Sequence, residues 1–203
     1  MTVVERVLDT MRHPFHLEGK EVFISASIGI ASAEPDHSAS DLLRNADMAM
    51  YVAKQSGSGQ YRRYEARMHT EALERLELEA DLRHAIDRDE FTLRYQPIVL
   101  LHTGEIAGVE ALVRWNHPTR GMMAPLTFIP LAEETGLIVP LGRWVVREAC
   151  RQAVGWQHLR PDGHPLTLTI NISGHQLQGE HVVDDVRRAL SDSGLDPRQL
   201  VLE

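Results

Sequence analysis

The sequence predicts an α/β protein in two parts, and three observations support this prediction. Residues 1–64 hold a short helix, a strand, a long helix and a final strand, which is too little for a complete α+β domain. Residues 65–90 have helical apolar spacing and contain no Pro- or Gly-rich linker. Residues 91–203 alternate strands with helices, which is typical of a parallel sheet with helical crossovers, as in an open α/β sheet or a TIM barrel.

Composition narrows the class of protein. Of the 203 residues, 43% are hydrophobic and 25% are charged, as in ordinary globular proteins. The net charge of −8 argues against a DNA-binding surface. The single cysteine, Cys150, excludes an internal disulfide, and its helical setting predicts a packing role. The eleven histidines form no HExxH pair or zinc-spaced cluster, so we expect scattered surface side chains.

Targeting and membrane signals are also missing from the sequence. No apolar run reaches the roughly 18 residues that cross a bilayer, and the first residues lack a signal-peptide pattern. We therefore expect this region to be cytoplasmic. The whole protein would be anchored to a membrane only through a segment upstream of residue 1.

The first part is built around one helix. Residues 21–31, EVFISASIGIA, are predicted to be a strand bounded by turn residues. Ser38 and Asp41 have capping-box spacing, and apolar residues then repeat at helical intervals until residues 56–57. A short strand at residues 60–64, QYRRY, ends this part.

The two parts are joined by a predicted helix. Residues 65–90 alternate acids and arginines around a narrow apolar stripe. We predict a helical connector over residues 65–79 and the opening helix of the second domain from residue 80. A dimerising coiled coil is the alternative, weakened by its short heptad pattern, and a homodimer stays open.

The strand that ends at Trp115 organises the second part. Residues 91–96 form a strand that passes through Pro97 and a turn at 102–104 into an alternating segment. One face of that segment is apolar and holds Val109, Ala111, Val113 and Trp115. The other holds Glu110, Leu112 and Arg114, and its two charges lie about 13 Å apart along the strand. A solvated edge strand is the alternative to a functional surface.

Strands and helices continue to the last residue. We predict helices at residues 127–135, 141–159 and 181–193, and strands at 166–173 and 199–203. A complete TIM barrel typically needs about 250 residues, so residues 80–203 are about half of one. We therefore expect this sequence to be an excerpt of a longer protein.

Three polar residues stand at or near the carboxyl ends of predicted strands: Glu110, Asn171 and Glu203. Active-site groups gather at that end of α/β barrels. Oxygen ligands without thiolate or imidazole suit Mg²⁺ or Mn²⁺ rather than zinc. Taken singly, Asn171 also fits as a partner for backbone groups at a strand end, and Glu203 as an exposed terminal acid.

Two phrases of the first part, SIGIA at 27–31 and LLRNADMAMYVAKQSGSGQY at 42–61, resemble the C-terminal part of GGDEF domains, the diguanylate cyclases. The resemblance implies a partial GGDEF domain over residues 1–64, whose catalytic hairpin and metal-binding aspartate would lie upstream. The complete domain would bind GTP, and Lys54 matches a phosphate-contacting lysine. Ser58 replaces a usual arginine. Because the catalytic hairpin would lie upstream, no cyclase activity is expected from these residues.

Six ordered motifs of the second part resemble the N-terminal half of EAL domains, the cyclic di-GMP phosphodiesterases. They are YQPIV at 95–99, EALVRW at 110–115, HPTRGMMAP at 117–125, FIPLAEETGLI at 128–138, INIS at 170–173 and the final LVLE. The resemblance implies a truncated (β/α)8 EAL domain over residues 80–203, joined to the partial GGDEF domain in tandem.

The EAL resemblance also assigns site residues. Glu110, Asn171 and Glu203 match metal ligands of the family, and Gln96, Leu112 and Arg114 match residues that contact the cyclic dinucleotide. Arg114 would do so through a phosphate. Glu110 and Arg114 would be the catalytic residues.

The implied reaction is metal-dependent hydrolysis of cyclic di-GMP to pGpG in bacterial second-messenger signalling. Two Mg²⁺ or Mn²⁺ ions would activate water and stabilise the leaving oxygen. The family's ligands for the second ion lie beyond residue 203, so we expect these 203 residues alone to be inactive. The alternative is a catalytically inactive cyclic di-GMP receptor that relays a signal.

Overall fold

A computed structural model describes most of the chain, and it divides into two compact units, Met1–Leu76 and Glu77–Glu203. The described residues are 2–55, 57, 59–159, 165–179 and 181–203. Ser58, which replaces the arginine usual in cyclases, lies outside them. No helix among the described residues is both long and apolar enough to cross a lipid bilayer.

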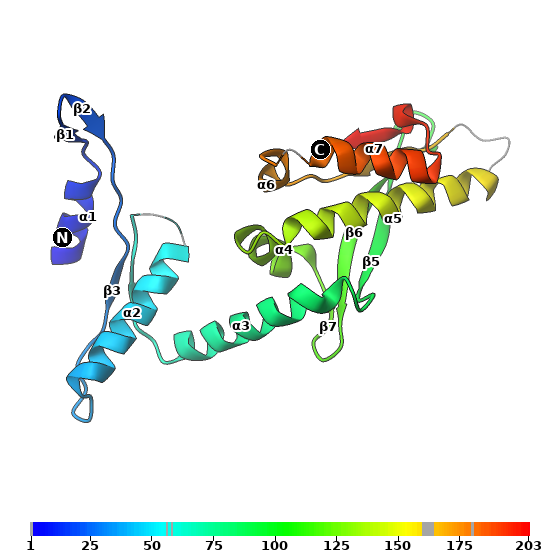
Figure 1. Ribbon diagram of the computed structural model, residues 1–203. Helices are drawn as coiled ribbons and strands as arrows, with labels where there is room; N and C mark the ends of the chain where they lie inside the picture. The colour runs from blue at the N-terminus through cyan, green and yellow to red at the C-terminus, as the bar shows by residue number, and fades with distance from the viewer. Residues whose placement is uncertain (1, 56, 58, 160–164, 180) are drawn as a thin grey trace. The chain divides into compact units, whose positions relative to one another are not determined.

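Up to residue 66, the described part of the first unit contains two small sheets and two helices (Figure 1). Its elements are α1 (Val3–Met11), β1 (Phe15–Leu17), β2 (Lys20–Val22), β3 (Ile28–Ile30), α2 (Ala39–Gln55) and β4 (Tyr61–Arg63). Strands β1 and β2 form an antiparallel hairpin, whereas β3 and β4 pair in parallel. The helix α2 connects the two parallel strands and contacts both of them.

The single strand predicted over residues 21–31 is wrong, because this segment forms two short strands. Strand β2 pairs with β1 across a turn in which Glu18 has a φ of 51°, and β3 pairs with β4. Residues 23–27 lie outside both pairings. A strand needs a hydrogen-bonded neighbour, and the two halves of this segment have different neighbours.

The helix α2 begins as its sequence predicts. The Ser38 backbone N–H donates to the Asp41 carboxylate over 3.1 Å, and the Asp41 N–H donates to the Ser38 hydroxyl over 3.2 Å. These reciprocal bonds satisfy N–H groups at the start of the helix. At Gly29 of β3, a Cβ would collide with the backbone of Ala46 and Met50 on α2, so only glycine allows this close approach.

The predicted connecting helix is present as α3 (Arg67–Ala85), but it is shorter than residues 65–90. The chain turns at residues 86–89, and Asp89 adopts a φ of 54°. The Glu90 N–H donates to the Ala85 carbonyl over 3.0 Å, which closes the end of the helix. Residues 86–90 therefore lead directly into the first strand of the second unit.

The second unit alternates strands with helices, as predicted. Its elements after α3 are β5 (Phe91–Val99), β6 (Ile106–His117), β7 (Gly121–Met123), α4 (Pro125–Glu134), α5 (Ile138–Leu159), β8 (Thr167–Ile170), α6 (Gly174–Leu177), α7 (Val182–Ser193), a 3₁₀ turn (Pro197–Gln199) and β9 (Leu200–Leu202). The strand β7 and the short helix α6 were not predicted, and α5 begins three residues before the predicted position at Leu141. Pro140 lies within the first turn of α5, where its missing N–H costs no helical bond.

One sheet organises the second unit, with the strand order β5-β6-β8-β9 and with β7 paired to β6. Strand β5 is antiparallel to β6, whereas β6, β8 and β9 run parallel. A register shift follows Ile98, one residue after the irregularity predicted at Pro97. The mixed α/β architecture is confirmed, and the described strands form part of a barrel wall without closing into a barrel.

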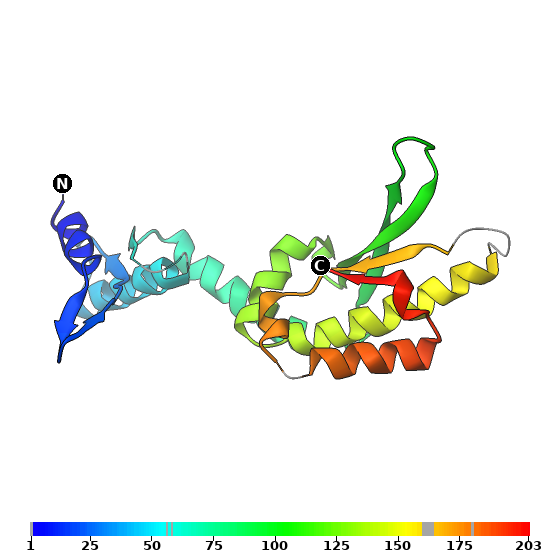
Figure 2. The ribbon, with the colours of Figure 1, turned by 90° about the horizontal axis from the view of Figure 1, so that it is seen from above.

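Helices cover one face of this sheet. Figures 1 and 2 show α5 and α7 side by side along that face, and the packed core lies between these helices and the strands. Trp115, Phe128, Leu168 and Ile170 are fully buried there. Cys150 is also buried, which confirms its predicted packing role. Figure 2 shows no helix on the opposite face within the described residues, and Gln96 and Asn171 are exposed on it.

Candidate functional site

The uncovered face of the sheet brings the predicted polar residues into one register. Gln96 of β5 pairs with Glu110 of β6, and Glu110 pairs with Thr169 of β8. Residues that pair directly, and residues two apart in one strand, point to the same face of a sheet. Gln96, Glu110, Leu112 and Arg114 therefore share this face, as strand alternation predicted.

Glu110 and Asn171 are in direct contact. The Asn171 side-chain amide donates to Oε1 of Glu110 over 2.7 Å, although the residues lie 61 positions apart in sequence. Asn171 follows the last residue of β8, and β8 runs beside β6 in parallel. The fold thus joins a carboxylate and an amide at the carboxyl ends of neighbouring strands.

Glu203 lies beside Asn171 in the next strand pairing. The Glu203 N–H donates to the Ile170 carbonyl over 3.0 Å, and the Ile172 N–H donates to the Glu203 carbonyl over 2.6 Å. These two bonds flank Asn171, so the parallel ladder sets Asn171 and Glu203 opposite each other. Both side chains are exposed at the same end of the sheet.

Arg114 is the site's half-buried cation. Its guanidinium donates to the Val113 carbonyl over 2.8 Å, which fixes one end of the side chain. Leu112, also half-buried, separates Arg114 from Glu110 on the strand. A guanidinium holds its charge at any physiological pH and matches phosphate oxygens in a forked geometry.

A pocket of about 350 Å³ opens next to this face. The pairing of β6 with β8 stops at Ala111 and Ile170, and the two strands are no longer paired beyond that point. The pocket lies at this point, and its walls include Leu112, Asn171 and Glu133 together with apolar residues of α4 and α5. Its volume and largely apolar lining are typical of small-molecule sites.

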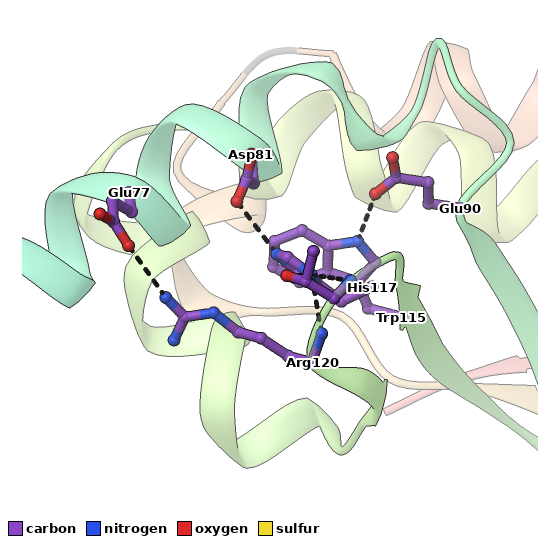
Figure 3. A network of polar contacts seen from close by, with 7 residues as sticks. Glu77, Asp81, Glu90, Trp115, His117 and Arg120 are labelled. Carbon is purple, nitrogen blue, oxygen red and sulfur yellow. Dashed lines mark hydrogen bonds and ion pairs between the residues drawn. The ribbon is translucent and has the colours of Figure 1, made fainter.

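A polar network on the other side of β6 holds the end of this strand (Figure 3). The His117 ring is buried, with 2% of its side chain exposed, and its Nε2 lies 3.0 Å from the Asp81 carboxylate of α3. Its Nδ1 accepts from the backbone N–H groups of Thr119 and Arg120, each over 3.3 Å. The prediction that histidines lie on the surface is therefore wrong for His117.

Two further contacts of this network join the same elements (Figure 3). The Trp115 indole N–H donates to the Glu90 carboxylate over 2.9 Å, and the Arg120 guanidinium lies 3.5 Å from Glu77 of α3. The Asn116 N–H donates to the Glu90 carbonyl over 2.7 Å. Beyond Ala111, β6 is thus held by β5, β7 and the end of α3 rather than by β8.

The donor atoms of the site fit a hard divalent cation. Glu110 and Asn171 each carry an oxygen ligand, their side chains are in hydrogen-bond contact through the Asn171 amide N–H, and Glu203 belongs to the neighbouring register position. An amide that donates its N–H₂ here can present its carbonyl oxygen after a flip about its last torsion. Among the described residues, no three His, Cys, Asp or Glu side chains gather closely enough to hold a metal by themselves.

Burial changes the acidity of two groups on the covered side of the sheet. Desolvation raises the pKa of the Cys150 thiol to about 11. Desolvation, followed by the nearby charge of Glu148, raises the pKa of Tyr95 above its usual range. The pKa of Glu148 is lowered, first by its hydrogen bond from Arg151. These groups pack behind the sheet and take no part in the polar face.

The sequence patterns did not single out Arg94 or the contact between His117 and Asp81. Arg94 pairs with Leu112 and therefore shares the polar face. The alternation of residues 91–96 already places Arg94 beside Gln96, so this signal was present in the sequence. The buried contact between His117 and Asp81 joins residues 36 positions apart, and no local pattern marks it.

The second unit forms part of an α/β barrel, with a carboxylate and an amide at the carboxyl ends of neighbouring strands. This arrangement indicates the class of domain. Family models divide the chain in the same way, with the EAL domain matching residues 79–203 and the diguanylate cyclase GGDEF domain matching residues 1–60. The chain belongs to the EAL domain family, with a GGDEF segment in tandem before the EAL domain.

Two named relatives are similar over nearly the whole chain. The bifunctional diguanylate cyclase/cyclic di-GMP phosphodiesterase MucR of Pseudomonas aeruginosa is 44% identical over 100% of the chain. The cyclic di-GMP phosphodiesterase PdeR of Escherichia coli is 40% identical over 94% of it. The chain spans only 29% of MucR and 28% of PdeR.

Solved structures of EAL domains share the fold. The PaMucR phosphodiesterase in its c-di-GMP complex has a TM-score of 0.58 and 45% identity, and the match covers 62% of this chain and 50% of that one. The Xanthomonas citri FimX EAL domain in complex with c-di-GMP has a TM-score of 0.56 and 29% identity, covering 66% of this chain and 51% of that one.

Proposed function

We propose that the protein carrying this chain is a metal-dependent cyclic di-GMP phosphodiesterase that produces pGpG. The observation that supports this most strongly is the 2.7 Å contact between Glu110 and Asn171, made by strands distant in sequence at the expected end of the sheet. The relatives MucR and PdeR are cyclic di-GMP phosphodiesterases by name, and PaMucR is known in complex with c-di-GMP.

In this proposal each site residue has a distinct role. Glu110, Asn171 and Glu203 would hold Mg²⁺ or Mn²⁺, which would supply Lewis-acid assistance to phosphodiester hydrolysis. Arg114 would bind a phosphate and neutralise charge that develops on it. Gln96 and Leu112 would orient the dinucleotide. The pocket beside Leu112 and Asn171 has room for part of such a ligand.

The activity is proposed for the protein as a whole rather than for these 203 residues alone. The described residues bring only Glu110 and Asn171 into side-chain contact at the site, whereas a two-metal centre needs further ligands. GTP binding by a complete GGDEF domain, homodimer formation, a cytoplasmic location and any membrane attachment through other segments belong to the same proposal.

Asn171 offers the direct test of this assignment. The whole protein is assayed with labelled cyclic di-GMP and Mg²⁺ or Mn²⁺, as wild type and as Asn171→Leu, which keeps the size but removes the oxygen ligand. We expect at least roughly a 100-fold loss of the rate of pGpG formation, because a lost metal ligand disturbs transition-state stabilisation. Asn171→Asp restores an oxygen ligand and is expected to recover part of the rate.

The matched control is Glu105→Ala, because Glu105 is an exposed acid before β6 and lies outside the polar face. This variant is expected to keep the wild-type rate. A wild-type rate of pGpG formation by Asn171→Leu would show that Asn171 is not a metal ligand.

A non-catalytic receptor of cyclic di-GMP is the second candidate. It is supported by the same face and pocket, since binding needs Arg114, Leu112 and Gln96 but no complete metal centre. Binding of intact cyclic di-GMP with and without Mg²⁺, measured beside pGpG formation, separates the two candidates. A receptor would bind equally well in both conditions and form no pGpG.

A further inference from the structure

Arg94 is a cation on the polar face that the proposed mechanism does not use. The β5–β6 register sets Arg94 opposite Leu112 and sets Thr92 opposite Arg114. Directly paired residues of antiparallel strands point to the same side, so Arg94 projects from the face that carries Glu110 and Arg114. Arg94 lies nearer than Gln96 to the end of β6 where Arg114 stands.

The opposite side of β5 confirms this orientation. Phe91 is buried against Trp115, and Tyr95 packs edge-on against Trp156 with ring centroids 4.5 Å apart. Strand alternation then leaves Arg94 and Gln96 directed away from the helices, and both are exposed. The orientation of Arg94 is therefore fixed by packing on the other side of the strand.

Arg94 differs in its surroundings from the arginines of this unit that pair with acids. Arg83, Arg143, Arg151 and Arg198 each form an ion pair with a carboxylate. Within the described part of the chain, the Arg94 side chain forms no hydrogen bond or ion pair. A long cationic side chain without a protein partner on a ligand-sized face is available to an anionic ligand.

The charges of the proposed ligand explain why a second cation is useful. A cyclic dinucleotide carries two phosphodiester groups, and each is an anion at neutral pH. Arg114 can pair with one of them, and part of its donor capacity is already directed to the Val113 carbonyl. Glu110 and Glu203 add negative charge to the same face, which raises the need for cations when a dianion binds.

We propose that Arg94 is a substrate-binding residue that pairs with a phosphate of the cyclic dinucleotide, beside the phosphate held by Arg114. The inference rests on the proposed function. Arg94 adds affinity for the dianion and takes no part in bond cleavage. Its removal therefore weakens binding and leaves the rate at saturation unchanged.

The test compares four variants of the whole protein: Arg94→Met, Arg94→Lys, Arg94→Ala and Arg147→Met. Arg147 is an exposed arginine of α5, on the covered side of the sheet, and serves as the matched control. KM and kcat are measured with cyclic di-GMP and Mg²⁺, and Kd is measured by calorimetry if the protein binds the dinucleotide without cleaving it.

We expect Arg94→Met and Arg94→Ala to raise KM or Kd about 10-fold to 100-fold, the range of a lost charged hydrogen bond. The value of kcat stays within about twofold, and the dependence of KM on salt becomes shallower because one ionic contact is gone. Arg94→Lys recovers part of the affinity, and Arg147→Met matches the wild type.

An unchanged KM or Kd in Arg94→Met, beside a wild-type protein that binds cyclic di-GMP, would overturn the role of Arg94 alone. A fall in kcat at constant KM would also overturn it, because the residue would then act in the chemical step. Failure of the wild type to bind the dinucleotide would overturn the proposed function together with this inference.

Discussion

The two faces of β6 come from one alternating segment and have opposite properties. On the covered face, Ala111, Trp115 and His117 are buried and packed against helices and aromatic rings. On the other face, Glu110 and Arg114 stay partly exposed, and Glu110 accepts a hydrogen bond from Asn171. The comparison separates stability from function: the covered face holds the strand, and the polar face carries the chemistry that we propose.

Trp115→Ala should cause the largest loss in the free energy of unfolding. The indole is fully buried, packs on Phe91 and Phe128, and donates to Glu90. We expect a loss of about 3–5 kcal/mol in the free energy of unfolding, from the cavity and the lost aromatic contacts. Urea denaturation of the protein, followed by circular dichroism, measures the loss.

The control lies on the other face of the same strand. Leu112→Ala removes a half-buried side chain and should cost only about 1 kcal/mol of unfolding free energy. Equal losses for Leu112→Ala and Trp115→Ala would mean that the two faces do not differ in their contribution to stability.

His117→Ala should have the next largest effect. The substitution leaves the Thr119 and Arg120 N–H groups without their acceptor and removes the contact with Asp81. We expect a loss of about 2 kcal/mol in the free energy of unfolding. A double-mutant cycle with Asp81→Ala should show a coupling of about 1 kcal/mol, since the side chains are in direct contact.

His175→Ala is the matched control for this prediction. His175 has 59% of its side chain exposed and lies 4.0 Å from Glu133, so its removal should change the free energy of unfolding by less than about 0.5 kcal/mol. If the losses in unfolding free energy caused by His117→Ala and Asp81→Ala were simply additive, the contact between His117 of β6 and Asp81 of α3 would be contradicted.

The pH dependence of the covered side gives a smaller effect. Desolvation raises the pKa of the Cys150 thiol to about 11 in the folded chain, above its ordinary value. As pH rises above about 9, the unfolded state loses this proton while the folded state keeps it. The contribution of the buried thiol to the free energy of unfolding is therefore complete below about pH 9 and is lost as pH rises towards 11.

Alkylation of Cys150 tests whether the thiol is buried and protonated in the folded chain. At pH 8, iodoacetamide should react with the unfolded chain in urea and barely react with the folded chain, because the buried thiol stays protonated. Rapid reaction in the folded state would contradict the packing of α5 over the covered face.

Glu110→Gln should have the smallest effect on stability. The side chain is half-buried, and glutamine keeps its shape and can still hydrogen-bond Asn171. We expect the free energy of unfolding to change by less than about 0.5 kcal/mol, as for substitutions outside the core. Thermal unfolding of the two proteins at one pH checks this, and a large loss would assign Glu110 a structural role.

Much of the fold could be predicted from the sequence, because period-two and helical patterns are strong in several segments. The alternation around Glu110 placed both faces of β6, and the capping residues of α2 placed the start of that helix. The split of residues 21–31 could not be predicted, since a strand's partner is chosen by the fold. Strand β7 is too short to show a pattern and exists through its pairing with β6.

The candidate site was predicted in part for the same reason. Each residue's place on a strand follows from local alternation, and the resemblance to EAL domains named Glu110 and Asn171. Their contact depends on the parallel register of β6 with β8, which no local pattern contains. The burial of His117 likewise depends on Asp81, a residue of a distant helix.

The proposed function places a metal-dependent phosphodiesterase site on the polar face of β6. The most direct measurement is pGpG formation from cyclic di-GMP by the whole protein, wild type against Glu110→Gln, with Mg²⁺ and with a chelator. We expect turnover by the wild type with Mg²⁺ only, and at least roughly a 100-fold slower rate for the folded Glu110→Gln variant. Wild-type turnover by Glu110→Gln, or turnover that the chelator leaves intact, would contradict it.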